Sequence, residues 1–487
     1  MKLNFDPPVS GLRVTIMGLG LHGGGAASAR FFASRGARVT VTDLNPEEVL
    51  RPSLETLGNY DIRYTLGGHQ GEDFSQADLV IKNPGVPRDS PWLPLARRVE
   101  TDLSVFLGLN RRRILGVTGS KGKSTTASAI YHVLRRLYPD PRLGGNITLS
   151  PLDFLSDERG LPLPLETWNQ DPSPVVLELS SWQLGDLAGR GILRPQGAVI
   201  TNILRDHQDR YSGMEAYVAD KEVIFKEQEP HQTALFPLED SYGPRFYGAA
   251  PGQRYYFSSR PMEGRPENPQ GWGAYLKGEE GFLRRASGEE RILPEKLALP
   301  GFHNRLNLLA AGGILALTGE DPEAIVRGLG DFQGVEHRLE FVREWRGIAI
   351  YNDSAATLPE AAAAALLSFS GPLYLITGGT DKNLDFSPLL PAINRPRRIY
   401  LLAGSAQDKY QALIKKARGL SAPVFESLEA AFEAALKDAE ADGLPAPPGG
   451  KEKPAPTLIL SPGCASFGMF LNEFDRGRKF KALAARL

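Results

Sequence analysis

The sequence predicts an α/β protein whose sheets are largely parallel and whose chain forms three domains. Strand-like and helix-like segments alternate from end to end, the pattern expected when helices cover parallel sheets. Two glycine-rich turns follow apolar strands, one near residue 20 and one near residue 120. At 487 residues the chain is too long for one ordinary domain. We expect the three domains to comprise residues 1–110, 111–335 and 336–487.

The composition narrows the class of protein. Hydrophobic residues make up 41% and charged residues 23%, as in globular proteins, and the net charge of −1 argues against nucleic acid as the main partner. Cys464 is the single cysteine, which excludes an internal disulfide and fits a reducing compartment. No apolar run reaches about 18 residues, and the N-terminus has no charged-then-apolar leader. We expect a cytoplasmic monomer without a membrane partner.

The first block has the pattern of a dinucleotide-binding fold. A strand at Arg13–Met17 runs into a G-x-G-x-x-G turn, and Asp43 ends the second strand. NAD(P) fits this fingerprint, but so do other nucleotide diphosphates, because the pyrophosphate rests on the helix N-terminus. A second phosphate loop about 100 residues later favours a UDP-type ligand over NAD(P), and a purely structural turn is the third reading. A helix to about Ser34 and strands at Arg38–Thr42 and Asp78–Lys82 complete the block, whose candidate contacts are Gly18, Leu19, Gly20, Leu21, His22 and Asp43.

The second block opens with a phosphate-binding loop, VTGSKGKSTT, at residues 117–126. It follows the apolar strand Ile114–Val117 and precedes a helix expected at Thr125–Tyr138. Glycines leave backbone N–H groups open to an anion, Lys123 supplies charge to the β- and γ-phosphates, and Ser124 supplies a hydroxyl to Mg²⁺. Val117 holds the first glycine position of the strict motif, so a tight structural turn is the alternative. The candidate ATP contacts in the loop are Gly119, Ser120, Lys121, Gly122, Lys123, Ser124 and Thr125.

Two further segments of this block carry candidate metal ligands. Glu178 ends a buried apolar strand, where a carboxylate is costly unless it is paired or bound to metal, although it could also cap a helix. His207 lies between Asp206 and Asp209 after another strand, and could bind metal, accept a proton or simply lie on the surface. From spacing alone Lys221 is a surface lysine or a salt-bridge partner. The expected elements are strands at Val175–Leu179 and Ala198–Asn202, helices at Met214–Gln228 and Asn304–Thr318, and short strands within 240–300.

In the third block polar residues recur after successive strands. Arg338 and Asp353 are plausible nucleotide contacts, and Lys382 and Ser466 could together hold a small carboxylate. Each is unremarkable alone, since such side chains are usually solvated, so the recurrence is what favours a site. Strands are expected at Ile348–Asn352, Leu373–Thr377, Arg398–Leu402 and Thr457–Leu460, a short helix at Glu360–Leu367, and a solvated loop at Ala441–Thr457.

The ordered set of these segments resembles the Mur ligase family, most closely the members that add D-glutamate to UDP-N-acetylmuramoyl-L-alanine. The resemblance covers nearly the whole chain. It rests on TGSKGKST, GGNI, LELSSWQL, TN…DHQDRY…K, LPGFHNRLN, HRLE, NDSAAT, GGTDKNLDFS and LSPGCAS. It implies a UDP-binding Rossmann-like N-terminal domain, a central P-loop ATPase domain and a Rossmann-like C-terminal domain that brings the amino acid.

The resemblance also implies a role for individual residues. Lys123, His207 and Lys221 would be catalytic, with Lys221 converted by CO₂ into a carbamate. Two Mg²⁺ ions would be held by Ser124, Glu178, His207 and the carbamate. The remaining positions fall into three sets: Asn146, Ser180 and Gln183 for the UDP substrate; Asn304, Asn307, Arg338 and Asp353 for ATP; and Thr357, Lys382 and Ser466 for the incoming amino acid.

The implied activity is ATP-dependent amide formation through an acyl phosphate in peptidoglycan precursor synthesis. Alternatives are a related ligase that adds another amino acid such as L-glutamate, an NAD(P)-dependent dehydrogenase, and a nucleotide-regulated binding protein. Three positions depart from the family pattern: Ala355 stands where lysine is common, Thr148 where glycine is usual, and Glu473-Phe474 displaces an aromatic by one. The segment Ala441–Thr457 lengthens the third domain.

Overall fold

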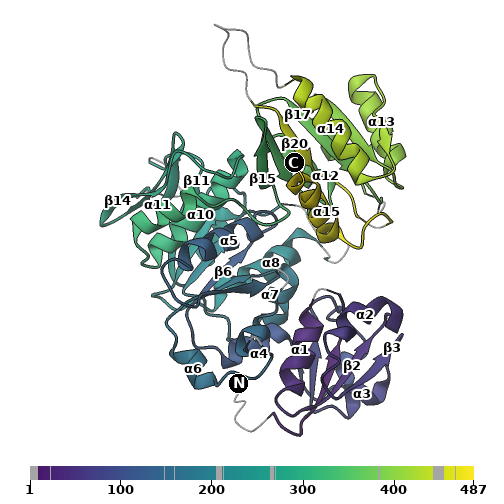
Figure 1. Ribbon diagram of the computed structural model, residues 1–487. Coiled ribbons are helices and arrows are strands. Elements are labelled where there is room, and N and C mark those ends of the chain that lie inside the picture. The colour runs from purple at the N-terminus through teal and green to yellow at the C-terminus, as the bar shows by residue number, and fades with distance from the viewer. Residues whose placement is uncertain are drawn as a thin grey trace. The chain divides into compact units, whose positions relative to one another are not determined.

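The computed structural model describes residues 9–21, 23–146, 149–157, 159–204, 211, 213–263, 268, 270–381, 384–442, 455–466 and 468–487. They form two compact units, Met1–Lys296 with Leu306–Gly330 and Leu297–Arg305 with Asp331–Leu487. The first unit contains two sheets and the second contains one, all flanked by helices (Figure 1). The expected α/β class with largely parallel sheets is confirmed.

The first sheet has five parallel strands in the order β3-β2-β1-β4-β5. Because β1 and β4 are neighbours, the loops that follow them leave the same edge of the sheet, at the point where the strand order reverses. This is the place where open α/β sheets bind ligands. The elements are β1 Arg13–Met17, α1 Gly24–Ala33, β2 Arg38–Asp43, α2 Glu47–Glu55, β3 Ile62–Leu66, α3 Gly71–Ser75, β4 Leu79–Lys82, η1 Leu93–Leu95, β5 Val99–Glu100 and α4 Asp102–Leu109.

The second sheet has nine strands in the order β14-β13-β12-β11-β10-β9-β6-β8-β7. The strands from β7 to β12 across the sheet are parallel, and β13 and β14 form antiparallel extensions. The elements are β6 Ile114–Thr118, α5 Lys123–Leu134, β7 Arg142–Gly145, η2 Pro151–Leu155, α6 Leu165–Gln170, β8 Val175–Glu178, α7 Ser181–Leu187, β9 Gly197–Ile200, α8 Met214–Lys226, β10 Thr233–Pro237, α9 Gly243–Ala249, β11 Gln253–Ser258, β12 Gly273–Lys277, β13 Glu280–Arg285, β14 Gly288–Leu293, α10 Phe302–Leu317 and α11 Pro322–Gly330.

The third sheet has six strands in the order β15-β16-β20-β17-β18-β19, of which only β15 is antiparallel to its neighbour. The loops after β16, β20 and β17 therefore leave one edge side by side. The elements are β15 Glu340–Trp345, β16 Ile348–Asn352, α12 Pro359–Leu366, β17 Leu373–Gly378, η3 Ser387–Leu389, β18 Arg398–Leu402, α13 Gln407–Arg418, β19 Val424–Phe425, α14 Leu428–Asp442, β20 Thr457–Leu460 and α15 Glu473–Ala485.

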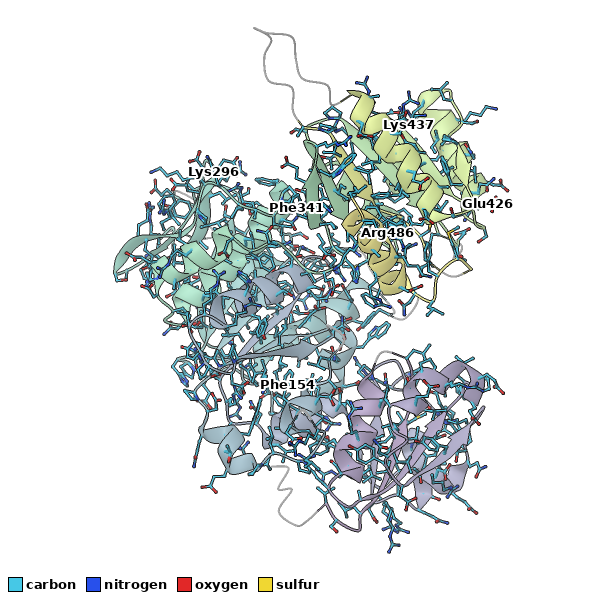
Figure 2. The ribbon with its side chains drawn as sticks, viewed as in Figure 1. Phe154, Lys296, Phe341, Glu426, Lys437 and Arg486 are labelled. Carbon is cyan, nitrogen blue, oxygen red and sulfur yellow. The ribbon has the colours of Figure 1, made fainter. Side chains whose placement is uncertain are left out.

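One apolar core connects the first two sheets. It runs from Phe31 and Phe32 of α1 to Leu155 of η2 and on into the strands of the second sheet. Phe154, labelled in Figure 2, stacks on Trp168 at 6.3 Å between ring centroids. In the second unit, α14 covers the third sheet with buried Ala435 and Ala439 and leaves its labelled Lys437 exposed (Figure 2). Within the described residues, no helix has the length and apolar character needed to cross a bilayer.

The elements differ from the expected ones mainly at their ends. α5 begins at Lys123 rather than Thr125, which places Lys123 and Ser124 in its first turn. At the expected loop Ala441–Thr457, α14 continues to Asp442 and β20 begins at Thr457, and residues 443–454 lie outside the described part. The half-exposed strand β3 lacks the apolar run that marks its neighbours.

Candidate active site

The phosphate loop connects β6 to α5 at the carboxyl edge of the second sheet. All five residues of β6 are buried, and the strand lies between β9 and β8, so its loop opens where the strand order reverses. Gly119 and Gly122 have φ angles of 143° and 83°. A Cβ atom would lie 1.9 Å from Thr201 Oγ1 at Gly119 and 2.2 Å from Asn307 Oδ1 at Gly122. The close packing of Thr201 and Asn307, as well as the turn, therefore requires glycine.

The loop is braced by the chain that follows β9. The Ser120 N–H donates to the Asn202 carbonyl at 2.8 Å, and the Lys121 N–H donates to Asn202 Oδ1 at 2.9 Å. Thr201 Oγ1 donates to the Lys121 carbonyl at 2.6 Å. Because the Ser120 and Lys121 N–H groups are already engaged, anion binding falls to the far end of the loop, where α5 begins. There the helix dipole and the terminal amides favour negative charge.

The side chains at the start of α5 have the chemistry of a nucleotide site. Lys123 Nζ donates to the carbonyls of Gly119 and Ser120, each at 3.0 Å, so the ammonium lies over the loop. Ser124 is buried in the first helical turn, and Thr126 donates to the Asn307 carbonyl at 3.4 Å. The loop, helix and Asn307 thus form one packed group within the first unit.

Glu178 is a buried carboxylate, and one of its two oxygens has no hydrogen-bond partner among the described residues. It ends β8, is 2% exposed, and accepts a hydrogen bond at Oε1 from Asn146 Nδ2 at 3.1 Å. Its other oxygen, Oε2, is buried without a hydrogen-bond partner among the described residues. An orphan carboxylate oxygen beside a phosphate loop fits a divalent cation, which would offset the cost of burial. In the part of the chain that the structure describes, no cluster of three His, Cys, Asp or Glu side chains completes such a site.

Lys221 is not the surface residue that its spacing indicates. It lies on α8, is 1% exposed, and its Nζ donates to the Gly119 carbonyl at 2.9 Å. The same ammonium lies 4.7 Å from the centre of the Tyr217 ring, which faces it with π electrons. The structure thus brings Lys221 to the phosphate loop, whereas His207 lies outside the described residues.

The turn after β1 has the geometry of a diphosphate site, with a different role for its acidic residue. Gly18, Gly20 and Gly23 all have positive φ, and Gly23 caps α1. Asp43 is 5% exposed and accepts from the Gly20 N–H at 3.0 Å and from Asn45 at 2.9 and 3.0 Å. Its carboxylate holds the turn in shape. Of the other predicted contacts, Leu19 is buried, Leu21 is half exposed and His22 lies outside the described residues.

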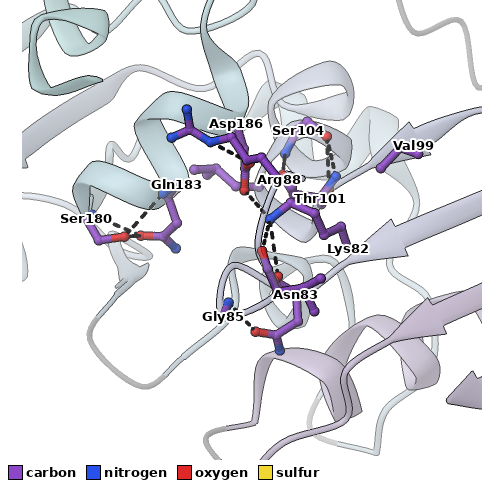
Figure 3. A network of polar contacts seen from close by, with 12 residues as sticks. Lys82, Asn83, Gly85, Arg88, Val99, Thr101, Ser104, Ser180, Gln183 and Asp186 are labelled. Carbon is purple, nitrogen blue, oxygen red and sulfur yellow. Dashed lines mark hydrogen bonds and ion pairs between the residues drawn. The ribbon is translucent and has the colours of Figure 1, made fainter. Parts of the chain in front are cut away.

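Ser180 and Gln183 belong to the N-terminus of α7. They form a reciprocal capping box, in which Ser180 Oγ accepts from the Gln183 N–H and Gln183 Oε1 accepts from the Ser180 N–H (Figure 3). The cap fixes the start of α7 directly after Glu178, so these predicted substrate residues also have a structural role. Asn146 is tied to the same strand end, since its N–H donates to the Glu178 carbonyl at 2.7 Å.

The second unit gathers its predicted residues at the carboxyl edge of the third sheet. Asp353 follows β16, is 6% exposed, and accepts from Ser461 Oγ at 2.7 Å and from the Leu339 N–H at 3.1 Å. Burial raises the pKa of its carboxyl to about 7. Arg338 is exposed in the turn that precedes β15. Asp353 therefore connects that turn to the residue after β20. A nucleotide at this position would contact a carboxyl group that already accepts two hydrogen bonds from the protein.

A buried arginine that sequence reasoning did not find supports the predicted amino-acid site. Arg476 of α15 is fully buried and donates to the carbonyls of Ser354 at 2.9 Å and Cys464 at 3.3 Å. It joins the loops that carry Thr357 and Ser466, and burial lowers its pKa to about 10. Lys382 lies outside the described residues. The only sequence signal that Arg476 connects these loops is its unusual position on the apolar face of a helix.

The two asparagines of the LPGFHNRLN segment belong to different units. Asn304 is 4% exposed and its Nδ2 donates to the Pro300 carbonyl at 2.7 Å, within the second unit. Asn307 packs against Gly122 in the first unit. Helix α10 therefore spans the boundary between the units.

A phosphate loop between a central parallel strand and a helix, with a buried acid and a buried lysine beside it, defines a nucleotide-using α/β protein. The models of three domains match successive parts of the chain: the MurD-like N-terminal domain at residues 12–103, the Mur ligase middle domain at 117–315 and the Mur ligase glutamate ligase domain at 337–444. This chain belongs to the Mur ligase family.

Full-length relatives narrow the comparison. The UDP-N-acetylmuramoylalanine–D-glutamate ligase of Treponema pallidum (strain Nichols) is 37% identical, with 97% of each chain covered. The enzyme of the same name from Roseiflexus sp. (strain RS-1) is 38% identical, with 98% of each chain covered. The resemblance inferred from sequence motifs is thereby confirmed.

Solved structures share the fold across the whole chain. UDP-N-acetylmuramate-alanine ligase from Thermotoga maritima matches with a TM-score of 0.60 at 21% identity, covering 98% of this chain and 99% of that one. MurF ligase from Thermotoga maritima in complex with ADP matches with a TM-score of 0.51 at 14% identity, covering 99% and 100%. At these identities the likeness concerns the fold alone.

Proposed function

We propose that this protein is an ATP-dependent ligase that joins D-glutamate to UDP-N-acetylmuramoyl-L-alanine in peptidoglycan precursor synthesis. The observation that carries the proposal is the phosphate loop with buried Glu178 and Lys221 beside it, in a chain whose full-length relatives bear that enzyme's name. The N-terminal turn then serves the UDP moiety, which favours the UDP-type reading of its fingerprint over NAD(P).

The reaction activates one carboxylate and couples it to an amine. The substrate carboxylate takes the γ-phosphoryl group of ATP and becomes an acyl phosphate. The glutamate amine attacks the acyl carbon, and the resulting tetrahedral intermediate expels phosphate. Lys123 and the N-terminus of α5 offset the negative charge where the γ-phosphate meets the carboxylate, so most of the catalysis is positioning and charge stabilisation.

The residues beside the loop suit Mg²⁺. Ser124 and Glu178 provide oxygen ligands, His207 and a carbamate on Lys221 complete the proposed set, and the metal would supply charge neutralisation on the phosphates. An ammonium about 4 Å from one positive charge costs roughly 4 kcal/mol at an effective dielectric near 20. A carbamate reverses that sign, which favours modification of Lys221 once metal is bound.

The three sheets support a separate role for each of three domains. We assign 1–110 to the UDP substrate, 111–335 to ATP, and 336–487 to the amino acid through Thr357, Lys382 and Ser466. Arg338, Asp353 and Asn304, which belong to the second unit, are the further nucleotide contacts that we propose. A cytoplasmic monomer remains our expectation for the protein.

The test is ADP release with UDP-N-acetylmuramoyl-L-alanine and a panel of D- and L-amino acids. We expect turnover with D-glutamate, at least tenfold less with L-glutamate, and none after Lys123→Ala. A stronger response to another amino acid would move the protein to a different ligase specificity. ADP release that needs no amino acid would refute amide formation.

A further inference from the structure

Four charged side chains join the loop after β4 to two helices of the second sheet. Lys82 ends β4 and its Nζ lies 2.9 Å from Asp186 Oδ2 of α7. Arg88 reaches the same carboxylate, with Nε 3.3 Å from Asp186 Oδ1, and its Nη2 lies 2.6 Å from Asp220 Oδ2 of α8. Figure 3 shows Lys82 and Arg88 converging on Asp186. We call Lys82, Arg88, Asp186 and Asp220 the β4 bridge.

One end of the β4 bridge lies at the proposed UDP site. Lys82 Nζ also donates to the Val86 carbonyl at 2.9 Å, which fixes the loop after β4. That loop packs on the glycine turn, because a Cβ at Gly18 would lie 3.0 Å from Asn83 Cβ and the Asn83 N–H donates to the Met17 carbonyl at 3.0 Å. A ligand on the turn therefore rests against the segment that carries Arg88.

The other end of the β4 bridge lies at the phosphate loop. Asp220 precedes Lys221, whose ammonium donates to the Gly119 carbonyl. Tyr211 donates to Asp220 Oδ2 at 2.9 Å, so the carboxylate receives both a guanidinium and a phenol. Lys82 Nζ donates to the Asn83 carbonyl at 3.4 Å, so a chain of contacts runs from Asn83 through Lys82, Asp186 and Arg88 to Asp220, the residue before Lys221.

A glycine inside α7 makes room for this contact. A Cβ at Gly185 would lie 1.5 Å from Arg88 Nη2 and 2.5 Å from Asp220 Oδ2. Glycine weakens the interior of a helix, so its presence here needs a reason, and the path of the guanidinium across α7 supplies one. Gly185, Arg88 and Asp220 form one geometric unit.

The exposed fractions of Lys82 and Arg88 indicate which side chain mainly stabilises the fold and which mainly positions the site. The Lys82 and Asp186 side chains are each 5% exposed, and loss of Lys82 would leave the buried Asp186 carboxylate with Arg88 as its only cation within the β4 bridge. The Arg88 side chain is 47% exposed while Asp186 and Asp220 are 5% and 13% exposed, so its ion pairs contribute less to stability than the buried Lys82–Asp186 pair. We expect Arg88 to matter more for the placement of the two sites than for stability, because small displacements between two reacting groups slow a reaction strongly.

We propose that Arg88 is a positioning residue that ties the loop beside the UDP site to the helix that carries Lys221, and thereby sets the substrate carboxylate against the γ-phosphate. The inference rests on the proposed function. Loss of Arg88 should loosen this alignment while leaving each binding site intact.

The test compares Arg88→Gln with Arg30→Gln. Arg30 lies 3.0 Å from Asp153, an ion pair that also joins α1 to the second sheet's η2 but does not reach α8. We expect kcat for ADP release to fall at least tenfold in Arg88→Gln, with KM for ATP and the calorimetric Kd for UDP-N-acetylmuramoyl-L-alanine within threefold of wild type. Arg30→Gln should keep kcat within twofold.

Two further variants keep the test decisive if Arg88→Gln folds poorly. Gly185→Ala should displace the guanidinium without changing any charge and should lower kcat in the same way. In a double-mutant cycle, Arg88→Gln with Asp220→Asn should be no slower than the slower single variant. Wild-type kcat in Arg88→Gln, or equal losses in Arg88→Gln and Arg30→Gln, would overturn the proposal. An inactive wild-type protein would instead refute the proposed function.

Discussion

At the scale of single residues, burial decides which side chains take part in the site. Lys221 and Glu178 are 1% and 2% exposed, and each has an environment that a solvated residue would not need. A motif match indicates which residue types occur, but not that the Lys221 ammonium meets the Gly119 carbonyl, because that contact joins positions 102 residues apart. Arg476 and Arg88 were missed for the same reason.

Replacing Lys221 should separate catalysis from folding. Lys221→Ala removes the ammonium that a carbamate needs, and we expect ADP release to fall at least a hundredfold. The Gly119 carbonyl loses one donor but keeps its hydrogen bond from Lys123, so the loss costs about 0.5–1.5 kcal/mol and the fold should persist. Lys226→Ala is the control, since Lys226 lies on the same helix and pairs at the surface with Glu222 at 3.3 Å. Wild-type turnover by Lys221→Ala would exclude the carbamate.

The carboxyl of Asp353 should make stability depend on pH. Its pKa of about 7 lies above the usual 3.8, so its contribution to stability is complete below about pH 4 and is lost as the pH rises through 7. In Asp353→Asn that loss disappears. We expect the urea midpoint of the variant, relative to wild type, to rise between pH 5 and pH 8 by an amount worth about 2.7 kcal/mol, since about two pH units of this range lie below the pKa of about 7, at about 1.36 kcal/mol per unit.

Asp385→Asn is the matched control for Asp353, because this exposed carboxyl has a lowered pKa through its hydrogen bonds to Ser387. Parallel pH profiles for Asp353→Asn and wild type would show that Asp353 does not carry the effect.

At the scale of elements, the pattern of alternating segments predicted most of the fold. Strands rich in apolar residues, such as β1, β16 and β18, were located to the residue, since buried parallel strands leave a clear signal. Short or half-exposed strands such as β3 and β19 were not, because their pairing depends on neighbours distant in sequence. The glycine turns were found correctly, but the bracing of the phosphate loop by Asn202 needs a tertiary contact that no motif reports.

The start of α5 should be intolerant of any side chain at Gly122. Gly122→Ala would adopt φ near 83° and meet Asn307 Oδ1, so we expect KM for ATP to rise at least tenfold with a stability loss of about 1–3 kcal/mol. Gly319→Ala is the control, because its φ is 97° but nothing lies within 4 Å of the added atom. The control should lose a similar amount of stability and keep the wild-type KM. Equal KM values in the two variants would contradict this account.

At the scale of the whole molecule, the proposed nucleotide contacts are divided between the two units. Asn307 and the phosphate loop belong to the first, and Arg338 and Asp353 belong to the second. A nucleotide that binds both must restrict their relative motion, as lids and closing domains do in other enzymes.

We therefore expect ATP with UDP-N-acetylmuramoyl-L-alanine to reduce the radius of gyration in X-ray scattering. Removal of Mg²⁺ with a chelator should abolish both the compaction and ADP release, and added Mg²⁺ should restore them. Compaction that persists in Arg338→Ala to the same extent would assign the effect to other contacts.

The order of the chain through the two units bears on how the protein is made. The first unit is interrupted after Lys296 by Leu297–Arg305 and is completed only by Leu306–Gly330, whose helix α11 packs against β14 and α5. A ribosome must therefore synthesise about two thirds of the polypeptide before the first unit can fold completely. Leu297–Arg305 can pack only after Asp331–Leu487, the rest of the second unit, has been translated. A premature stop near residue 330 would leave that short stretch exposed, and we expect such a fragment to be captured by chaperones or degraded.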